Sequence, residues 1–187
     1  MKVAIIGRTR ALIQVAKEVL KAGHEIPLVY TCKAEKFYEF DETEFEKFAE
    51  QNEAEFYCDV NINNTSVVEK ISSLGIDVAV SLNWLNVLKA PIIEAFNKGI
   101  WNIHMGDLPR YKGNACPNWA IINGEKEIGL TIHHMIPEKI DEGDIIDKTF
   151  LNINNSTYIG DVYTWLENVT PSLIIKNLEL LRKDNLK

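Results

Sequence analysis

The sequence has few cysteines, no excess of positive charge and no long run of apolar residues. Its cysteines, Cys32, Cys58 and Cys116, are odd in number, lie far apart and lack CxxC spacing. Neither a disulfide framework nor a thiolate metal site is indicated by this spacing. We therefore predict ordinary reduced thiols and no bound metal.

The charge balance and the hydropathy argue against two further classes of protein. A formal net charge of −7 opposes a nucleic-acid-binding surface, because neutralising phosphates requires clustered Lys and Arg. No apolar run approaches the roughly 20 residues that span a bilayer, and the first residues lack the apolar segment of a signal peptide. We expect a cytoplasmic protein without nucleic-acid or membrane partners.

Length and pattern together predict the fold. A chain of 187 residues with 46% hydrophobic content supports one well-buried core, so we predict a single domain over residues 1–187. Apolar runs predict strands at 2–6, 24–30, 55–58, 77–81 and 99–104, and helical spacing predicts helices at 11–21, 65–73 and 91–97, with an acidic helical stretch within 35–55. This alternation predicts an α/β fold with one doubly wound, mainly parallel sheet.

The last third of the chain continues with mixed elements. We expect a helix at 115–122, strands at 129–135 and 144–152, and a C-terminal amphipathic helix over about 158–183. The apolar stripe of that helix consists of Leu166, Leu173, Ile174, Leu178 and Leu181. We expect the stripe to pack on the domain, and the helix is also a candidate surface for a homodimer.

The segment WNIHMGDLPRYKG ends a predicted strand with an amide and an imidazole. Residues two apart on a strand point to the same face, so Asn102 and His104 project together while Ile103 faces the other side. Ligands of open α/β sheets collect beyond the carboxyl ends of the strands, which makes this a candidate reaction centre. A buried histidine with satisfied hydrogen bonds beside a turn-forming asparagine would give the same pattern.

Carboxylates gather at a second place, in the sequence IPEKIDEGDII. Asp141, Glu142 and Asp144 surround Gly143 between two predicted strands. A solvated hairpin turn has this composition. A carboxylate close to His104 and Asn102 would instead complete a set of acid, base and oxyanion donors.

These motifs carry a resemblance that covers about a third of the chain, from Ser81 to Ile146. The sequence NIHMGDLPRYKGNACPNWAIINGEKEIGLTIHHM followed by IDEGDII resembles the folate-dependent formyltransferases in both order and spacing. That family includes glycinamide ribonucleotide, methionyl-tRNA and sugar-nucleotide N-formyltransferases. The resemblance implies a Rossmann-like formyltransferase fold and a catalytic triad of Asn102, His104 and Asp141.

The chemistry implied by the resemblance is transfer of a formyl group from 10-formyltetrahydrofolate to a primary amine, without a metal. The Asn102 amide and a protonated His104 would donate hydrogen bonds to the developing oxyanion. Asp141 would orient His104 or a bridging water and accept or relay the proton of the amine.

The resemblance also implies binding residues. It places folate beside the segment LNWLNVL and the IDEGD loop, which gives as candidates Trp84, Leu85, Leu88, Asp141, Gly143 and Asp144. Three apolar residues at the spacing of the first segment also occur as plain core. Candidates for the acceptor side are Arg8, Arg10, Met105, Gly106, Arg110, Lys112 and His133.

Some acceptor-side assignments have simpler alternatives. His133 and His134 are neighbours on a predicted strand and must face opposite sides, and similarity to the family motif favours His133. Arg110 and Lys112 suit a phosphate of the acceptor, but basic residues of an exposed loop are often only solvated.

Departures from the family pattern bear on the acceptor. After the first strand the chain reads GRTRALI, where the glycinamide ribonucleotide enzyme has a loop rich in Gly and Asn. About forty residues follow IDEGDII, where the tRNA enzyme has a further domain, and Met105 replaces the usual proline. We therefore expect a phosphate-bearing small-molecule amine, specifically an amino-sugar nucleotide. Glycinamide ribonucleotide formyltransfer, formyltetrahydrofolate hydrolysis and non-catalytic folate binding stay open as alternatives.

Overall fold

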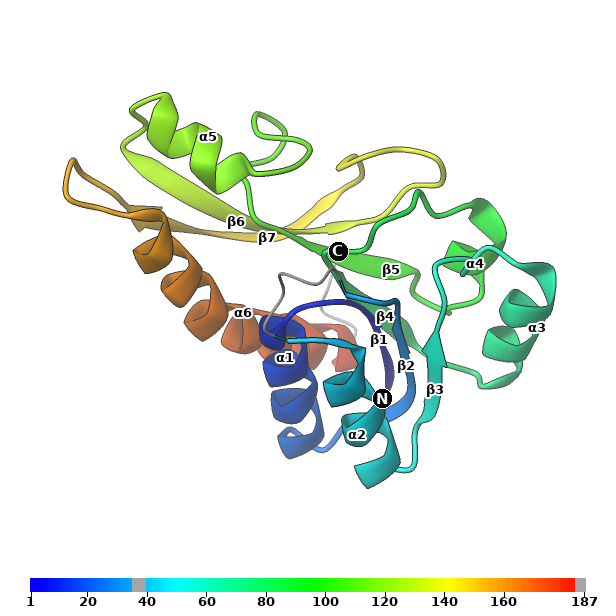
Figure 1. The fold of residues 1–187 in the computed structure, drawn as a ribbon. Helices are drawn as coiled ribbons and strands as arrows, with labels where there is room; N and C mark the ends of the chain where they lie inside the picture. The colour runs from blue at the N-terminus through cyan, green and yellow to red at the C-terminus, as the bar shows by residue number, and fades with distance from the viewer. Residues whose placement is uncertain (35–39, 184–187) are drawn as a thin grey trace.

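The described residues, 1–34 and 40–183 of a computed structural model, contain a seven-stranded sheet. Its strands are β1 (Lys2–Gly7), β2 (Glu25–Thr31), β3 (Glu55–Cys58), β4 (Val78–Leu82), β5 (Ile100–His104), β6 (Glu127–His134) and β7 (Ile145–Asn152). The helices are α1 (Arg10–Lys21), α2 (Glu42–Gln51), α3 (Thr65–Ser73), α4 (Ala90–Glu94), α5 (Cys116–Ile122) and α6 (Ile159–Arg182). The strands lie in the order β3-β2-β1-β4-β5-β6-β7 (Figure 1).

The direction of winding reverses between β1 and β4. From β1 the chain adds β2 and β3 on one side, and it then returns to add β4 and β5 on the other. These five strands are parallel, whereas β6 and β7 pair antiparallel to their neighbours. The predicted doubly wound, mainly parallel sheet is confirmed. Its reversal point between β1 and β4 is where ligands of such folds bind.

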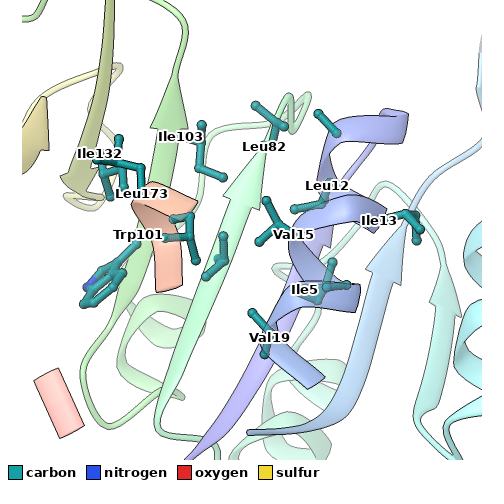
Figure 2. Close-up of a cluster of buried hydrophobic side chains, with 14 of the residues drawn as sticks. Ile5, Leu12, Ile13, Val15, Val19, Leu82, Trp101, Ile103, Ile132 and Leu173 are labelled. Atoms are coloured by element: carbon teal, nitrogen blue, oxygen red, sulfur yellow. The ribbon is translucent and has the colours of Figure 1, made fainter. Parts of the chain in front are cut away.

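Both faces of the sheet are covered, because alternate residues of each central strand point to opposite sides. On β1, Val3 and Ile5 join a hydrophobic cluster with α1, α2 and α6, and Ala4 and Ile6 join a second cluster with α3 and α4. Figure 2 shows the first cluster, in which side chains from the strands meet those of α1 and α6. Burial on two faces explains why the central strands read as continuous apolar runs.

The C-terminal helix follows the predicted stripe. Leu166, Leu173, Ile174 and Leu178 of α6 are buried in the first cluster, and the half-buried Leu181 packs against it. The helix packs extensively along α1, as Figure 1 shows. The predicted packing of the helix is therefore confirmed, and the homodimer stays a prediction.

Several predicted boundaries shift. The helix expected at 91–97 ends at Glu94, and the strand expected from 129 begins at Glu127. Of the acidic stretch 35–55, the structure shows α2 and β3, and residues 35–39 lie outside the described residues. Among the helices of the described ranges, none is both long enough and apolar enough to span a bilayer.

Candidate active site

A cavity of about 700 Å³ opens at the carboxyl ends of β1, β4 and β5. Of the predicted site residues, those that line it are Arg8, Trp84, Leu85, Asn102, His104, Met105 and Asp141. A second groove of about 730 Å³, lined by residues of α1 and α6, contains none of them. The first cavity, which lies beside the reversal point of the sheet, is therefore the candidate active site.

His104 and Asp141 form a buried ion pair at this cavity. The Nδ1 atom of His104 lies 3.3 Å from Oδ1 of Asp141, and the two side chains are 7% and 12% exposed. On the other side of the ring, the Nε2–H of His104 donates to the carbonyl oxygen of Tyr111 at 2.6 Å. Both ring nitrogens thus face acceptors, an arrangement that suits an imidazolium.

The electrostatics support a charged His104. Burial acts to lower the pKa of His104, but the Asp141 carboxylate, the Cys116 thiol and the Tyr111 carbonyl outweigh it and raise that pKa to about 10. Burial acts to raise the pKa of Asp141, and the hydrogen bond and charge of His104 prevail and lower it. Both effects favour the ionised pair at neutral pH.

Asn102 is held by the second histidine of the site. The Nδ1–H of His133 donates to the carbonyl oxygen of His134 at 2.9 Å, which leaves Nε2 of His133 as an acceptor. The Asn102 amide nitrogen lies 3.1 Å from that Nε2 and donates to it. Burial lowers the pKa of His133, so this ring is neutral beside the cationic His104. Asn102 keeps a second N–H for the cavity.

The loop before β7 brings Asp141 to this place. Asp141 has φ of 48°, a left-handed conformation that aspartate tolerates better than most residues. Its Oδ2 accepts the backbone N–H of Gly113 at 2.7 Å. The turn at Gly143 packs tightly, since a Cβ there would lie 2.1 Å from the carbonyl oxygen of His134. The carboxylate is therefore fixed from both the ring and the backbone side.

The loop after β5 passes close to the His104 ring at Gly106. A Cβ at Gly106 would lie 2.5 Å from Nε2 of His104 and 2.6 Å from the Tyr111 carbonyl oxygen. The hydrogen bond between those two atoms thus needs a glycine beside it. Gly106 is not among the residues that line the cavity, and its role as an acceptor contact stays a prediction.

The loop after β1 holds Arg8 at the cavity wall. Its Nε–H donates to the carbonyl oxygen of Asn83 at 3.2 Å, and its backbone N–H donates to that of Leu82 at 3.0 Å. Gly7 allows this close approach, because a Cβ there would lie 2.0 Å from the Leu82 carbonyl oxygen. Arg8 is 8% exposed and faces the cavity, while Arg10 is an exposed first residue of α1 that does not line it.

Other predicted residues lie away from the cavity wall. Leu88 is 2% exposed and packs in the second hydrophobic cluster, so it is core and not part of a ligand slot. Arg110 pairs with Glu125 at 2.6 Å, and Lys112 pairs with Glu142 at 3.1 Å. Asp144 contributes its carbonyl oxygen to the backbone N–H of His134. None of these side chains lines the cavity, and the same holds for Gly143 and His133.

Sequence reasoning missed three partners of the His104–Asp141 pair. Two are backbone groups, the Tyr111 carbonyl and the Gly113 N–H, which carry no side-chain signal. The third is the Cys116 thiol, whose sulfur lies 3.6 Å from Nε2 of His104. Its only sequence signal is its place at the start of a helix that follows the WNIHMGDLPRYKG loop.

Comparison with known proteins gives consistent matches. Residues 1–178 match the family model described as formyl transferase. The methionyl-tRNA formyltransferase of Clostridioides difficile is 28% identical over an alignment of 188 residues, which covers 99% of this chain and 60% of that protein. The chain thus spans about 60% of the length of such curated relatives.

Solved structures agree on the fold. WlaRD, a sugar 3N-formyltransferase crystallised in the presence of dTDP and 5-N-formyl-THF, is 25% identical with a TM-score of 0.73, and the match covers 100% of this chain and 65% of that one. Phosphoribosylglycinamide formyltransferase from Bacillus halodurans is 23% identical with a TM-score of 0.79, over 97% and 95% of the two chains.

Proposed function

The chain belongs to the formyl transferase family, and from this premise we propose that it transfers a formyl group from 10-formyltetrahydrofolate to the primary amine of an amino-sugar nucleotide. Membership of the family confirms the resemblance inferred from the NIH and IDEGD motifs. The observation that carries the proposal is the buried His104–Asp141 pair beside Asn102, at the wall of a cavity of about 700 Å³.

Asn102 and His104 are the proposed oxyanion donors. Attack of an amine on a formyl carbon puts negative charge on the formyl oxygen, and preorganised N–H groups stabilise that charge. Asn102 offers its second amide N–H, since the first donates to His133. The Nε2–H of His104 donates to the neutral Tyr111 carbonyl, and an anionic oxygen beside it would be the stronger acceptor.

Asp141 keeps His104 charged and is the proposed acceptor for the proton lost by the amine. Its Oδ1 faces His104, and its Oδ2 accepts the Gly113 N–H, so the carboxylate cannot rotate freely. Oδ1 also lies 3.9 Å from Nε2 of His133, which is beyond hydrogen-bond distance. A proton received by this carboxylate can pass to a bridging water, because both ring nitrogens of His104 already carry protons.

The apolar wall of the cavity fits a folate. Leu85, Val87 and Ile140 are exposed by 52%, 44% and 62% and lie together at the cavity with Trp84. Apolar side chains left in contact with water around a cavity favour a ligand with flat aromatic rings. We assign them to the pterin and benzoyl groups of the donor, which supplies the formyl carbon.

Arg8 supports a phosphate-bearing acceptor. It is the predicted basic residue that the structure buries at the cavity wall, where its Nε–H donates to the carbonyl oxygen of Asn83. Guanidinium groups bind phosphate through paired N–H donors. The net charge of −7 opposes tRNA, and WlaRD, the relative with dTDP, favours a nucleoside diphosphate sugar.

A product assay tests the proposal. The purified protein would be incubated with 10-formyltetrahydrofolate and, separately, with amino-sugar nucleotides, glycinamide ribonucleotide, methionyl-tRNA or no amine. Release of tetrahydrofolate would be followed by absorbance, and products would be identified by mass spectrometry. His104→Ala serves as the inactive control.

The outcomes separate the alternatives. A formylated amino-sugar nucleotide is the expected product, with turnover that depends on His104. Glycinamide ribonucleotide or methionyl-tRNA as the preferred acceptor would keep formyl transfer and overturn the acceptor assignment. Formate in the absence of an amine would indicate a hydrolase, and folate binding without turnover on any acceptor would contradict the catalytic proposal.

A further inference from the structure

The thiol of Cys116 lies against the catalytic histidine on the side away from Asp141. Its sulfur is 3.6 Å from Nε2 of His104, 3.2 Å from the carbonyl oxygen of Gly113 and 3.5 Å from that of Tyr111. Cys116 is 4% exposed and is one of the residues that line the cavity. It is the side chain through which α5 reaches the ring.

The backbone before α5 is shaped to bring the thiol there. Gly113 has φ of 88°, and Ala115, the residue that precedes the helix, has φ of 55°. A left-handed alanine is unfavourable by about 1 kcal/mol or more, so surrounding contacts must hold it. The resulting turn places the Cys116 sulfur between the Gly113 carbonyl oxygen and the His104 ring.

The hydrogen-bonding capacity of the thiol fixes its role. A thiol has one proton to donate, and the Gly113 carbonyl at 3.2 Å is its nearest acceptor. The sulfur lone pairs then remain for the Nε2–H of His104, which is shared with the Tyr111 carbonyl. Sulfur is a weak acceptor, so it can orient this N–H without competing strongly with an oxyanion.

We infer that Cys116 is a positioning residue, whose sulfur holds the His104 ring with its Nε2–H directed at the reacting group. The kinetic part of this inference rests on the proposed formyl transfer, whereas the effect on the ring does not. A plain space-filling role is the competing explanation, because Cys116 is also a buried residue of moderate volume.

The charges around the ring agree with this role. The groups that face His104 are the Asp141 carboxylate, the Tyr111 carbonyl, the Cys116 thiol and the His133 ring, whose centre lies 6.3 Å away. Burial alone would lower the pKa of His104, and the contact with Cys116 acts with Asp141 to raise it. Loss of the sulfur should therefore make the imidazolium lose its proton at a lower pH.

Three substitutions separate polarity from volume. Cys116→Ser and Cys116→Ala leave side chains of similar size, but only serine keeps a group that donates to Gly113 and accepts from His104. Cys116→Val fills the space without any acceptor. Cys58→Ser, at an exposed cysteine that does not line the cavity, is the control for loss of a thiol.

The measurement is an NMR titration of His104 in the folate-free protein with labelled histidine. The chain has four histidines, so each signal can be assigned by single substitution. We expect the pKa of His104 to fall by about half a pH unit in Cys116→Ala and Cys116→Val, less in Cys116→Ser, and not at all in Cys58→Ser. The alkaline limb of kcat should move in the same order, with the KM for folate changed by less than about twofold.

Each outcome decides between the two roles. An unchanged titration in the alanine and valine variants, or equal shifts for serine and alanine, would show that Cys116 only fills space. If the titration follows the expected order while no amine is formylated by the wild type, the positioning role stands and the proposed function fails. If Cys116→Ala does not fold, the two roles are separated by comparing the pKa of His104 in Cys116→Ser and Cys116→Val.

Discussion

The carboxyl ends of β5 and β1 face the same cavity, but they are built differently. At β5, the charged and polar groups are partners of one another: His104 with Asp141, and Asn102 with His133. At β1, the side chain of Arg8 donates to the backbone carbonyl oxygen of Asn83 in the loop after β4 and lines the cavity. The end of β5 carries a network of side chains that fix one another, whereas the end of β1 places a guanidinium at the cavity.

This difference indicates how the two ends would divide the reaction. A network whose members fix one another is suited to a charge that develops only in the transition state, because nothing needs to reorganise when it forms. A buried guanidinium at the cavity wall is suited to a charge already present on a substrate. Substitutions at β5 should therefore lower kcat, and substitutions at β1 should raise KM.

The largest effect is expected for His104→Ala. Removal of an oxyanion donor lowers the rate constant by roughly a hundred- to a thousandfold, because the charge it contacts is absent from the ground state. Steady-state kinetics and equilibrium binding of a folate analogue should show a collapsed kcat with near-normal affinity. Asn102→Ala, the matched variant two residues away on β5, should behave in the same way. A His104→Ala protein that keeps most of the wild-type rate would show that the network is structural.

Asp141→Asn should come next, with a loss of roughly a hundredfold in kcat. The substitution keeps the shape of the side chain and removes the charge that raises the pKa of His104. Burial then dominates, so the pKa of His104 falls and the alkaline limb of the kcat profile moves to lower pH. If the alkaline limb of the kcat profile stays at the same pH, a group other than His104 controls that limb.

The same variant has a defined effect on stability. His104 has a raised pKa when folded, so its contribution to stability is full below its unfolded value of 6.5 and is lost as pH rises through about 10. Asp141 has a lowered pKa, so its contribution is present above 3.8 and is lost as pH falls through the folded value. Urea denaturation should show that Asp141→Asn lowers the free energy of unfolding most between pH 3.8 and 6.5, and less above about pH 10.

Much of this arrangement could be predicted from the sequence. The doubly wound sheet follows from apolar runs that alternate with helical patterns, and the common side of Asn102 and His104 follows from the period of a strand. The grouping of these two with Asp141, far along the chain, rested on the family resemblance, because spacing alone does not bring a distant turn to a strand end.

What could not be predicted has a physical origin. The Tyr111 carbonyl and the Gly113 N–H act through backbone atoms that every residue has. Leu88 lies in the same short segment as Trp84 and Leu85 but turns into the core, and composition cannot show which side chains of a loop face the cavity. The left-handed conformation of Asp141 also has no sequence signal, since aspartate adopts it only occasionally.

A further prediction tests the β1 end of the cavity. Arg8→Met should raise the KM for the acceptor by roughly tenfold with kcat little changed, because a charged hydrogen bond to a bound phosphate is lost. Arg8→Lys keeps the charge without the paired N–H donors, so its KM for the acceptor should lie between those of the wild type and Arg8→Met. Kinetics at saturating folate would measure both, with melting temperatures to confirm folding. A large loss of kcat in Arg8→Met would remove the contrast between the two ends.

The smallest effects are expected for Arg110→Ala and Lys112→Ala, which ask whether positive charge near the site is sufficient for acceptor binding. Both side chains are exposed and paired, Arg110 with Glu125 and Lys112 with Glu142, and neither lines the cavity. Exposed ion pairs contribute little, because water screens both charges. We expect the KM for the acceptor to change by less than about twofold in each variant at physiological salt. An increase as large as that of Arg8→Met would mean that the loop after β5 folds over the acceptor when it binds, and the division between a catalytic end and a binding end would then have to be redrawn.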